Sequence, residues 1–413
     1  MSRKIKKCRN CNNNNFLELF SLGKIAFTGK FTNNYKTQIP KDFINLILCT
    51  KCKLVQIDRN FNSRYLYGKD YGYRSGINAT MSDHLKKIAN KLKIITKLKR
   101  GDAVLDIASN DGTLLNNYPK NIISIGVDPI IEKLSKFYNK EHIKIGDFFS
   151  ARKIFQLKIK KKFKIITAIS VFYDLKKPNS FLRDVNKIID TKNGIFLLEH
   201  ADLCSIIKNN LFDTICHEHL TYYSSKIIIN MAIKNNFKII DIERNEINGG
   251  STRFYFAHKE SIYKEKKEKI SRALDFEKKF KLERSQTFTK FYKKILKLKT
   301  SLNFLIDKIK KNKKIIHGYG ASTKGNVLLQ FYGIGSGEIK YIADRNIKKN
   351  NHYTPGTRIK IINEKKSRSL KPDYYLVLPW HFKKEILDRE KKLLKKNTNF
   401  IFPLPQLRVI KCG

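Results

Sequence analysis

Short apolar runs alternate with helical stretches through the middle of the chain. Ala103 to Ala108 reads as a buried strand, Ser109 to Thr113 as a glycine-containing turn, and Leu114 as the opening of a helix. Further runs read as strands at Ile123 to Asp128, Ile143 to Phe149, Ile165 to Leu175 and Gly194 to His200. Strands separated by helices predict a parallel sheet with crossover helices, which is an α/β domain.

The flanking segments continue this pattern. Leu85, Ile88 and Leu92 have helical spacing and predict a helix that begins near Thr80. One more strand is expected at residues 253–258, and the charged stretch at 264–313 predicts a helical link between two lobes. A second α/β unit then opens with the strand KIIHGYG, the turn ASTKGN, a helix and the strand IKYIADRN.

Length and charge narrow the class of protein. The 413 residues suggest two to four domains, and a hydrophobic share of 41% excludes wholesale disorder. The chain shows neither an apolar run of about 20 residues nor the apolar segment of a signal peptide, so we expect a cytoplasmic protein without a membrane span. The net charge of +49 raises the hypothesis of a nucleic-acid partner. Lysines spread over the whole chain, without an arginine-rich arm, argue against specific nucleic-acid binding.

Four of the seven cysteines form two CxxC pairs. Their positions are Cys8, Cys11, Cys49 and Cys52, with 37 residues between the pairs. Two such pairs are typical of a zinc ribbon or knuckle, in which each turn aims two thiolates at one tetrahedral ion. Because protein ligands fill all four positions, the predicted zinc is structural and not catalytic.

The segment VLDIASNDGTLL places a turn after the first predicted strand of the middle region. The dinucleotide fingerprint GxGxxG is absent, because Ala108 and Asn110 occupy its first two glycine positions. Acids at three successive strand ends suit the ammonium group, ribose diol and adenine of S-adenosylmethionine; the alternative is an ordinary core with incidental acids. The expected cofactor contacts are Asp106, Ala108, Asn110, Gly112, Asp128, Asp147 and Phe148.

The segment FDTICHEHLTYYS holds two histidines around one glutamate. The spacing of His217, Glu218 and His219 differs from the HExxH of zinc proteases, and adjacent helical residues point about 100° apart. Proton transfer suits this set better, with a histidine as base, a carboxylate to orient or charge it, and Tyr222 nearby. For His217 a core or capping role is the favoured alternative.

The segment HGYGASTKGN predicts a phosphate site. Ser322, Thr323 and Lys324 stand at the start of a helix after a glycine turn, where backbone N–H groups can bind an anion. Asp344 ends the next strand, and the loop YTPGT with Tyr353 is expected at the same sheet edge. A tight turn without a ligand is the alternative.

Taken in order, the motifs resemble those of the three-domain sugar C-methyltransferases, which act on nucleotide-linked keto-deoxysugars. The resemblance covers essentially the whole chain, from the CxxC pairs through YGYRSG, DIASNDGTLL, TICHEHLTYYS, NGGSTR, GYGASTKGN, ADRN and PGT. It implies a zinc-binding domain at residues 1–65 and a Rossmann-like class I methyltransferase domain at 66–245. A C-terminal Rossmann-like domain with the helical linker follows at 246–413 and grips the sugar nucleotide.

The resemblance also implies residue roles. His219 is the expected base that removes a proton beside a keto group, with Glu218 as its partner. Residues expected over the methionine end of the cofactor or the sugar are Tyr71, Ser75 and His84. Residues expected to bind the nucleotide-linked sugar are Ser322, Thr323, Lys324, Asn326, Asp344, Asn248 and Tyr353.

Two departures from the family leave other hypotheses open. Cys216 stands where a tyrosine often precedes the HEH triplet, and Asp174 or Leu175 where a histidine often follows the fourth strand. An O-methyltransferase acting on a surface-polysaccharide precursor is the second hypothesis. A zinc-containing nucleic-acid-binding protein and an NAD-dependent oxidoreductase are further ones, and both a monomer and a dimer are compatible with the sequence.

Overall fold

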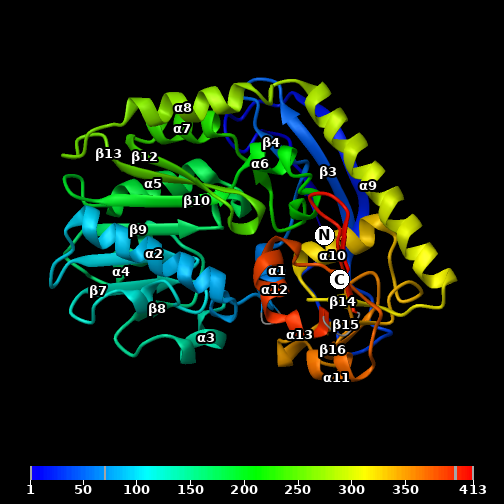
Figure 1. Cartoon of the computed structure of the whole chain (residues 1–413). Helices are drawn as coiled ribbons and strands as arrows, with labels where there is room; N and C mark the ends of the chain where they lie inside the picture. The colour runs from blue at the N-terminus through cyan, green and yellow to red at the C-terminus, as the bar shows by residue number, and fades with distance from the viewer. Residues whose placement is uncertain (1, 69–70, 395–397, 412–413) are drawn as a thin grey trace.

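A computed structural model describes residues 2–68, 71–394 and 398–411 of the chain. Residues 69 and 70 of the tyrosine-rich segment, and Cys412, lie outside the described residues. Three sheets build the domains (Figure 1), and β1 (Arg3–Lys4) pairs with β5 (Arg59–Asn60) in a short ribbon.

The central sheet has seven strands in the order β12-β13-β10-β9-β6-β7-β8. Its strands are β6 (Ala103–Ile107), β7 (Ile123–Val127), β8 (Ile143–Ile145), β9 (Phe163–Ile169), β10 (Ile195–Ala201), β12 (Phe237–Asn245) and β13 (Ser251–His258). Neighbours from β8 to β10 pair in parallel, whereas β13 runs antiparallel between β10 and β12. The strand order reverses between β6 and β9, which is where open α/β sheets bind ligands. The expected Rossmann-like class is confirmed, with a mixed instead of an all-parallel sheet.

Helices cover both faces of the central sheet. On one face α2 (Ala79–Thr96) buries Leu85 and Ile88 against Val104, and its first turn is capped by the Asn78 side chain. The other face carries α4 (Ala151–Gln156), α5 (Pro178–Ile188), α7 (Ser225–Lys234) and α8 (Lys267–Lys278). Shorter helices are α3 (Ile131–Leu134) and α6 (Leu203–Lys208).

The helix expected to open at Leu114 is only a short 3-10 turn at Leu115–Asn117. The Asn117 side chain donates to the carbonyl oxygens of Thr113 and Leu114, at 2.7 and 3.4 Å. Such asparagine bonds compete with helical backbone bonds. Pro119 then prevents the helix from continuing, so the sequence-based prediction is wrong at this element.

The N-terminal sheet has the order β11-β4-β3-β2. Its strands are β2 (Phe16–Ala26), β3 (Lys41–Cys49), β4 (Val55–Ile57) and β11 (Thr221–Tyr222), and α1 (Ser63–Leu66) follows it in the chain. Because β11 comes directly after the HEH segment, that segment is fixed between the N-terminal and central domains.

The C-terminal sheet has the order β16-β15-β14-β17-β18-β19, with β19 antiparallel at its edge. Its strands are β14 (Ile316–Tyr319), β15 (Tyr341–Asp344), β16 (Lys360–Asn363), β17 (Tyr374–Val377), β18 (Asn399–Phe402) and β19 (Arg408–Ile410). Its helices are α10 (Thr323–Tyr332), α11 (Glu364–Ser369), α12 (Lys383–Arg389) and α13 (Lys391–Leu394). The predicted helical link is formed by α8 and the long α9 (Ser285–Lys311), which packs beside β2.

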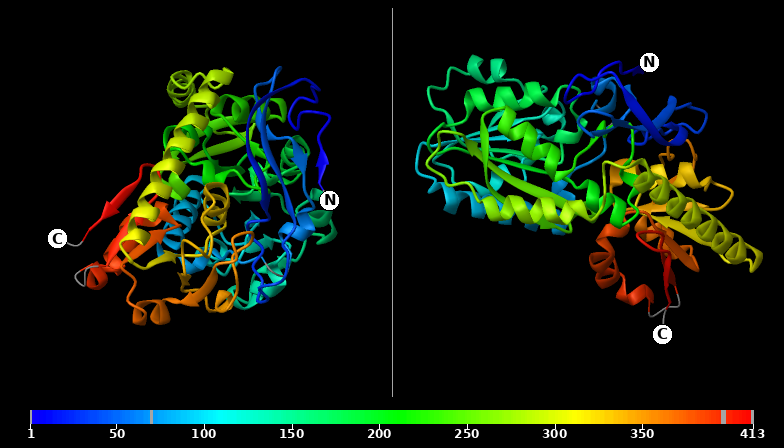
Figure 2. Two further views of the ribbon diagram at one scale, coloured as in Figure 1. Left: turned by 90° about the vertical axis from the view of Figure 1, so that its right-hand side faces the viewer. Right: turned by 90° about the horizontal axis from the view of Figure 1, so that it is seen from above.

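Figure 2 shows the N-terminal and C-terminal sheets at the same end of the central domain, and one continuous apolar core joins them. The proposed domain boundary after residue 245 falls between β12 and β13, two paired strands of the central sheet. β13 is buried along its whole length and so belongs to the central core. The highly charged part of the chain begins only after it, near the start of α8.

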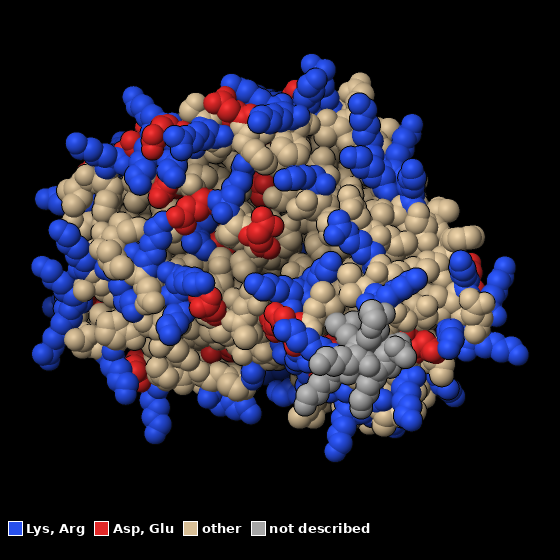
Figure 3. Space-filling view, viewed as in Figure 1, with Lys and Arg blue, Asp and Glu red and all other residues tan. Residues whose placement is uncertain are grey.

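Basic side chains are dispersed over the surface. Figure 3 shows Lys and Arg over the whole of one face, with acidic side chains scattered among them. Among the described residues, no helix is long and apolar enough to cross a membrane.

Candidate active site

A cavity of about 590 Å³ lies at the carboxyl ends of the central and C-terminal strands. Its walls come from the loops after β6, β7 and β9, from the HEH segment, and from the loops after β14 and β15. Phe31 and Ser63 contribute to the cavity from the N-terminal domain. Residues of all three domains therefore share one cavity.

The turn after β6 forms the part of the cavity nearest the sheet switch point. Ala108 and Asn110 line the cavity with φ values of +59° and +49°. Gly112, with φ of +74°, is not among its lining residues. A Cβ at Gly112 would lie 2.7 Å from the Tyr138 ring, so this glycine permits packing behind the turn and does not touch the cavity.

Two acids at adjacent strand ends face this turn. Asp128 accepts the N–H of Asn110 at 3.0 Å and that of Ile130 at 2.9 Å, and burial raises its pKa. Asp106 accepts the Thr167 hydroxyl at 2.6 Å, and burial raises the pKa of Asp106 to about 7. Both acids line the cavity, so each carboxyl is accessible to a ligand that carries a ribose diol or an ammonium group.

The third acid, Asp147, lines the cavity together with Phe148. Its carboxylate forms an ion pair with Lys153, which lowers the pKa of Asp147 below its ordinary value. Asp147 therefore stays charged beside an aromatic wall.

The tyrosine-rich segment before α2 covers the cofactor side of the cavity. Tyr71 and Ser75 line it, and the Ser75 N–H donates to the Asn110 side-chain oxygen at 2.9 Å. His84 does not line it, although Met81 and Leu85 on the same helix do. The expected cofactor contact of His84 is therefore not formed.

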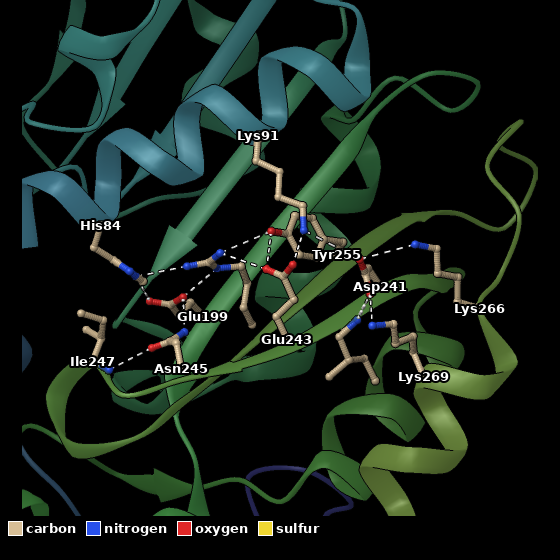
Figure 4. A network of polar contacts seen from close by, with 12 residues as sticks. His84, Lys91, Glu199, Asp241, Glu243, Asn245, Ile247, Tyr255, Lys266 and Lys269 are labelled. Atoms are coloured by element: carbon tan, nitrogen blue, oxygen red, sulfur yellow. Dashed lines mark hydrogen bonds and ion pairs between the residues drawn. The ribbon is translucent and has the colours of Figure 1, made fainter.

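His84 instead joins a polar network on the face of the sheet under α2 (Figure 4). Its Nε2 atom lies 2.6 Å from the Glu199 carboxylate, which Arg253 also binds at 2.7 Å. Burial opposes ionisation of Glu199, but His84 and Arg253 together hold its pKa below the ordinary value. Arg253 also bonds Glu243 at 3.1 Å, so the network ties α2 to β10, β12 and β13.

His219 lines the cavity as a neutral imidazole. Its Nδ1 lies 2.7 Å from the Thr214 carbonyl oxygen, and its ring centroid lies 4.3 Å from that of Tyr173. Burial, with the charge of Lys324 added, lowers the pKa of His219 to about 3. The expected pairing with Glu218 is not formed, because the Thr214 carbonyl occupies the Nδ1 position.

Glu218 lines the same cavity with its carboxyl buried. Its Oε2 accepts the Thr28 hydroxyl at 3.2 Å, and burial raises its pKa. Tyr222 lies behind the loop and donates to the His219 carbonyl at 3.0 Å, without lining the cavity. His217 also lies outside the cavity, and its ring centroid lies 4.4 Å from that of Phe27. His217 is therefore a core residue, and the predicted catalytic role is wrong for it.

The start of α10 forms the opposite end of the cavity. Ser322 caps this helix, and Thr323 and Lys324 follow it at the cavity wall. The Lys324 ammonium donates to the Asn248 carbonyl at 2.9 Å, and burial lowers its pKa. Asp344 lines the cavity as well, and accepts the Ala321 N–H at 2.7 Å.

Two expected substrate contacts point elsewhere. Asn326 is fully buried one turn into α10, and its side chain donates to the Thr28 carbonyl at 2.7 Å. Tyr353 bridges to Thr32 of the N-terminal domain and does not line the cavity. Both residues join domains to one another instead of contacting the cavity.

Three cavity residues were missed by sequence reasoning. Asp174 follows β9 and has a buried oxygen without a hydrogen-bond partner among the described residues. Lys349 is half-buried and donates to the Ala321 carbonyl at 2.6 Å, and His381 lies after β17. The lysine-rich composition hides Lys349, whereas the departure from the family pattern at Asp174 was an available signal.

The four-cysteine cluster lies apart from the cavity. The Sγ atoms of Cys8, Cys11, Cys49 and Cys52 lie within 4.8 Å of one another, with Cys8–Cys52 at 3.6 Å and Cys11–Cys49 at 3.5 Å. A tetrahedral zinc with Zn–S bonds of about 2.3 Å needs sulfur atoms about 3.8 Å apart. The thiols therefore fit a structural zinc ion.

Comparisons with known proteins agree with this architecture. Residues 73–242 match the family model of a methyltransferase domain, and residues 246–405 match that of a C-methyltransferase C-terminal domain. The C-methyltransferase NovU of Streptomyces niveus is 26% identical over 99% of this chain and 97% of its own length. The relative and both models indicate a methyltransferase.

Solved structures show weaker likeness. An S-adenosylmethionine-dependent methyltransferase from Clostridium acetobutylicum is 12% identical, covers 43% of this chain and 92% of its own, with a TM-score of 0.34. The plantazolicin methyltransferase BamL is 13% identical, covers 44% and 86%, with a TM-score of 0.35. The fold assignment therefore depends on the strand order and the matched family model.

Proposed function

We propose that this chain, a methyltransferase with a C-methyltransferase C-terminal domain, methylates a carbon atom of a nucleotide-linked keto-deoxysugar. The observation that carries the proposal is the position of His219. A neutral imidazole, fixed through Nδ1, faces the cavity that also holds the acids after β6 and β7 and the start of α10. A base thus lies between a candidate cofactor site and a candidate phosphate site.

S-adenosylmethionine, when bound, supplies an electrophilic methyl group. Asp128 would accept its ribose hydroxyls and Asp106 would face its ammonium group, since both acids line the cavity. Asp147 and Phe148 provide an acceptor and an apolar wall for adenine. The chemistry of this donor set fits the cofactor, with a carboxylate for each polar end.

The start of α10 suits a diphosphate. Free backbone N–H groups at a helix start attract anions, and the ammonium groups of Lys324 and Lys349 add positive charge beside them. Both lysines are half-buried and bond to carbonyl oxygens. A diphosphate anchored there would place the attached sugar towards His219.

The chain's own residues perform the proton transfer. Nε2 of His219 takes the proton from the carbon beside the keto group, and the electron pair of that C–H bond moves toward the keto oxygen. The phenols of Tyr71 and Tyr173 line the cavity, and burial raises their pKa well above the ordinary value, so both remain donors to that oxygen. Bound S-adenosylmethionine would supply the methyl group that this carbon accepts.

The test is incubation with methyl-¹³C-labelled S-adenosylmethionine and a panel of nucleotide-linked keto-deoxysugars. A product methyl in the upfield range of carbon-bound methyl groups is expected in the ¹³C NMR spectrum. A methoxy signal would instead support the O-methyltransferase. Absence of labelled product, from protein that binds S-adenosylhomocysteine in titration calorimetry, would contradict this substrate class.

A further inference from the structure

The chain segment that follows β2 runs from the N-terminal sheet to the cavity and is held by two side chains of α10. Gln330 accepts the Ala26 N–H at 2.6 Å and donates to the Ala26 carbonyl at 3.2 Å. Asn326, one turn earlier on the same helix, donates to the Thr28 carbonyl at 2.7 Å. Amide side chains at i and i+4 lie on one helical face, so α10 fixes the backbone at both ends of this short segment.

Thr28 connects this segment to Glu218. Its hydroxyl donates to the Glu218 Oε2 atom at 3.2 Å, across 190 residues of sequence. Thr28 and Asn326 are each 0% exposed and Glu218 is 4% exposed. A Cβ at Gly29 would lie 3.0 Å from the other carboxylate oxygen, Oε1, so a larger residue here would require the carboxyl to shift by a few tenths of an ångström.

Burial disfavours a charged carboxylate at Glu218, and so does the neighbouring Asp174 carboxyl. Its Oε1 atom is buried without a hydrogen-bond partner among the described residues, and the group borders the cavity. The titratable groups that face it are Asp174, Cys216, Tyr67 and Tyr71. None of these four is a cation, and a second carboxyl raises the cost of ionising Glu218. The Cys216 thiol, the Thr28 hydroxyl and the Gly29 N–H work in the opposite sense, because each favours the charged form of the carboxyl.

We propose that Thr28 is a positioning residue for Glu218, and that Asn326 links the seating of α10 to the geometry of that carboxyl. The N-terminal domain thereby contributes to the catalytic centre and not only to the zinc site. Lys324 stands at the start of the same helix, so an anion bound there would contact the element whose Asn326 side chain holds Thr28, the partner of Glu218. The inference deepens the proposed function and rests on it for the kinetic readout alone.

The direct test follows the titration of Glu218 in protein labelled with ¹³C at glutamate Cδ, with S-adenosylhomocysteine bound. Glu218→Gln assigns the signal. Thr28→Val, which keeps the shape but removes the donor, is expected to raise the Glu218 pKa by about one pH unit. Thr28→Ser, which keeps the hydroxyl, is expected to restore the titration. Exposed Thr37→Val is the matched control and should leave it unchanged.

Kinetics give the second readout. Thr28→Val and Asn326→Ala are expected to lower kcat about tenfold at unchanged affinity for S-adenosylhomocysteine, because the altered carboxyl lies outside the cofactor contacts. A Glu218 titration identical in wild type and in folded Thr28→Val would overturn the inference. If the wild type methylates no keto-deoxysugar, the proposed function fails, while the titration still decides the role of Thr28.

Discussion

The Nδ1 atom of His219 lies 2.7 Å from the carbonyl oxygen of Thr214. A carbonyl oxygen can only accept, so Nδ1 carries the hydrogen and Nε2 keeps the lone pair that can take a proton. The backbone of the preceding 3-10 turn, Phe212–Thr214, therefore sets the tautomer. Glu218 is left free for a separate role, with Thr28 as its partner.

Replacing His219 should remove the base. His219→Asn is expected to lower kcat by about 100- to 10,000-fold, which is the usual contribution of a general base. Solvent deuterium exchange at the carbon beside the ketone, followed by ¹H NMR, should stop as well. Binding of S-adenosylhomocysteine should persist. Undiminished exchange would place the base on another side chain.

Lys324 should control the basicity of His219. Burial is the larger cause of the low pKa of His219, and the positive charge of Lys324 adds to it. Lys324→Met removes that charge, so the His219 pKa should rise from about 3 towards its ordinary value. Ring-¹³C NMR of labelled histidine measures this shift, and Lys314→Met, an exposed change, is the control. A pKa that falls or stays fixed would contradict the assigned coupling.

The same relation predicts an effect of substrate. A diphosphate beside Lys324 would offset its charge, so the acid limb of kcat should lie at higher pH than that of kcat/KM. The first profile reports groups in the enzyme–substrate complex and the second those in the free enzyme.

Asp128 should determine cofactor affinity. Its carboxylate accepts two backbone N–H groups, which fix its orientation at the cavity wall. Asp128→Asn removes the charge and one acceptor, and should weaken S-adenosylhomocysteine binding about 10- to 100-fold in titration calorimetry. Asp102→Asn, before β6 at the opposite end of the strand, should bind as the wild type does.

Sequence reasoning located two acids at the carboxyl ends of neighbouring strands, although it missed Asp174 and His381, which also follow strands. Asp106 and Asp128 were predictable because parallel strands bring their carboxyl ends to one edge of the sheet. The directions of side chains within helices were not predictable in the same way. His84 and Asn326 lie on helices close to cavity residues, but packing turns one towards Glu199 and the other towards Thr28.

Contacts between residues far apart in the sequence were also not predictable. Thr28 meets Glu218 only because β11 joins the N-terminal sheet, beside β4. A two-residue strand with no apolar alternation of its own gives no signal for that pairing. The cysteine spacing, by contrast, predicted a compact cluster because both pairs lie on short local turns.

The cysteine cluster should hold one zinc ion per chain and support the HEH loop. Arg9, between two of the cysteines, donates to the Ile57 carbonyl at 2.7 Å, and Ile57 donates its N–H to the Leu220 carbonyl at 2.9 Å. Cys49→Ser should therefore lose zinc, measured by plasma mass spectrometry, and lower the Tm. Cys204→Ala, a buried cysteine outside the cluster, should keep its zinc. Full zinc content in Cys49→Ser would contradict this ligand set.

The network around Glu199 should make stability depend on pH. Glu199 has a depressed pKa in the folded protein, so its stabilising effect is present above the unfolded glutamate pKa of about 4.3 and declines as pH falls through the folded value. Glu199→Gln leaves Arg253 with fewer partners and should cost about 3 kcal/mol of unfolding free energy at pH 7. Urea unfolding should show this difference shrinking at pH values below about 4. Exposed Glu265→Gln is the control and should match the wild type at both pH values. A Glu199→Gln deficit that stays constant down to acidic pH would mean that packing, and not the charge of Glu199 beside Arg253 and His84, sets the contribution of this residue.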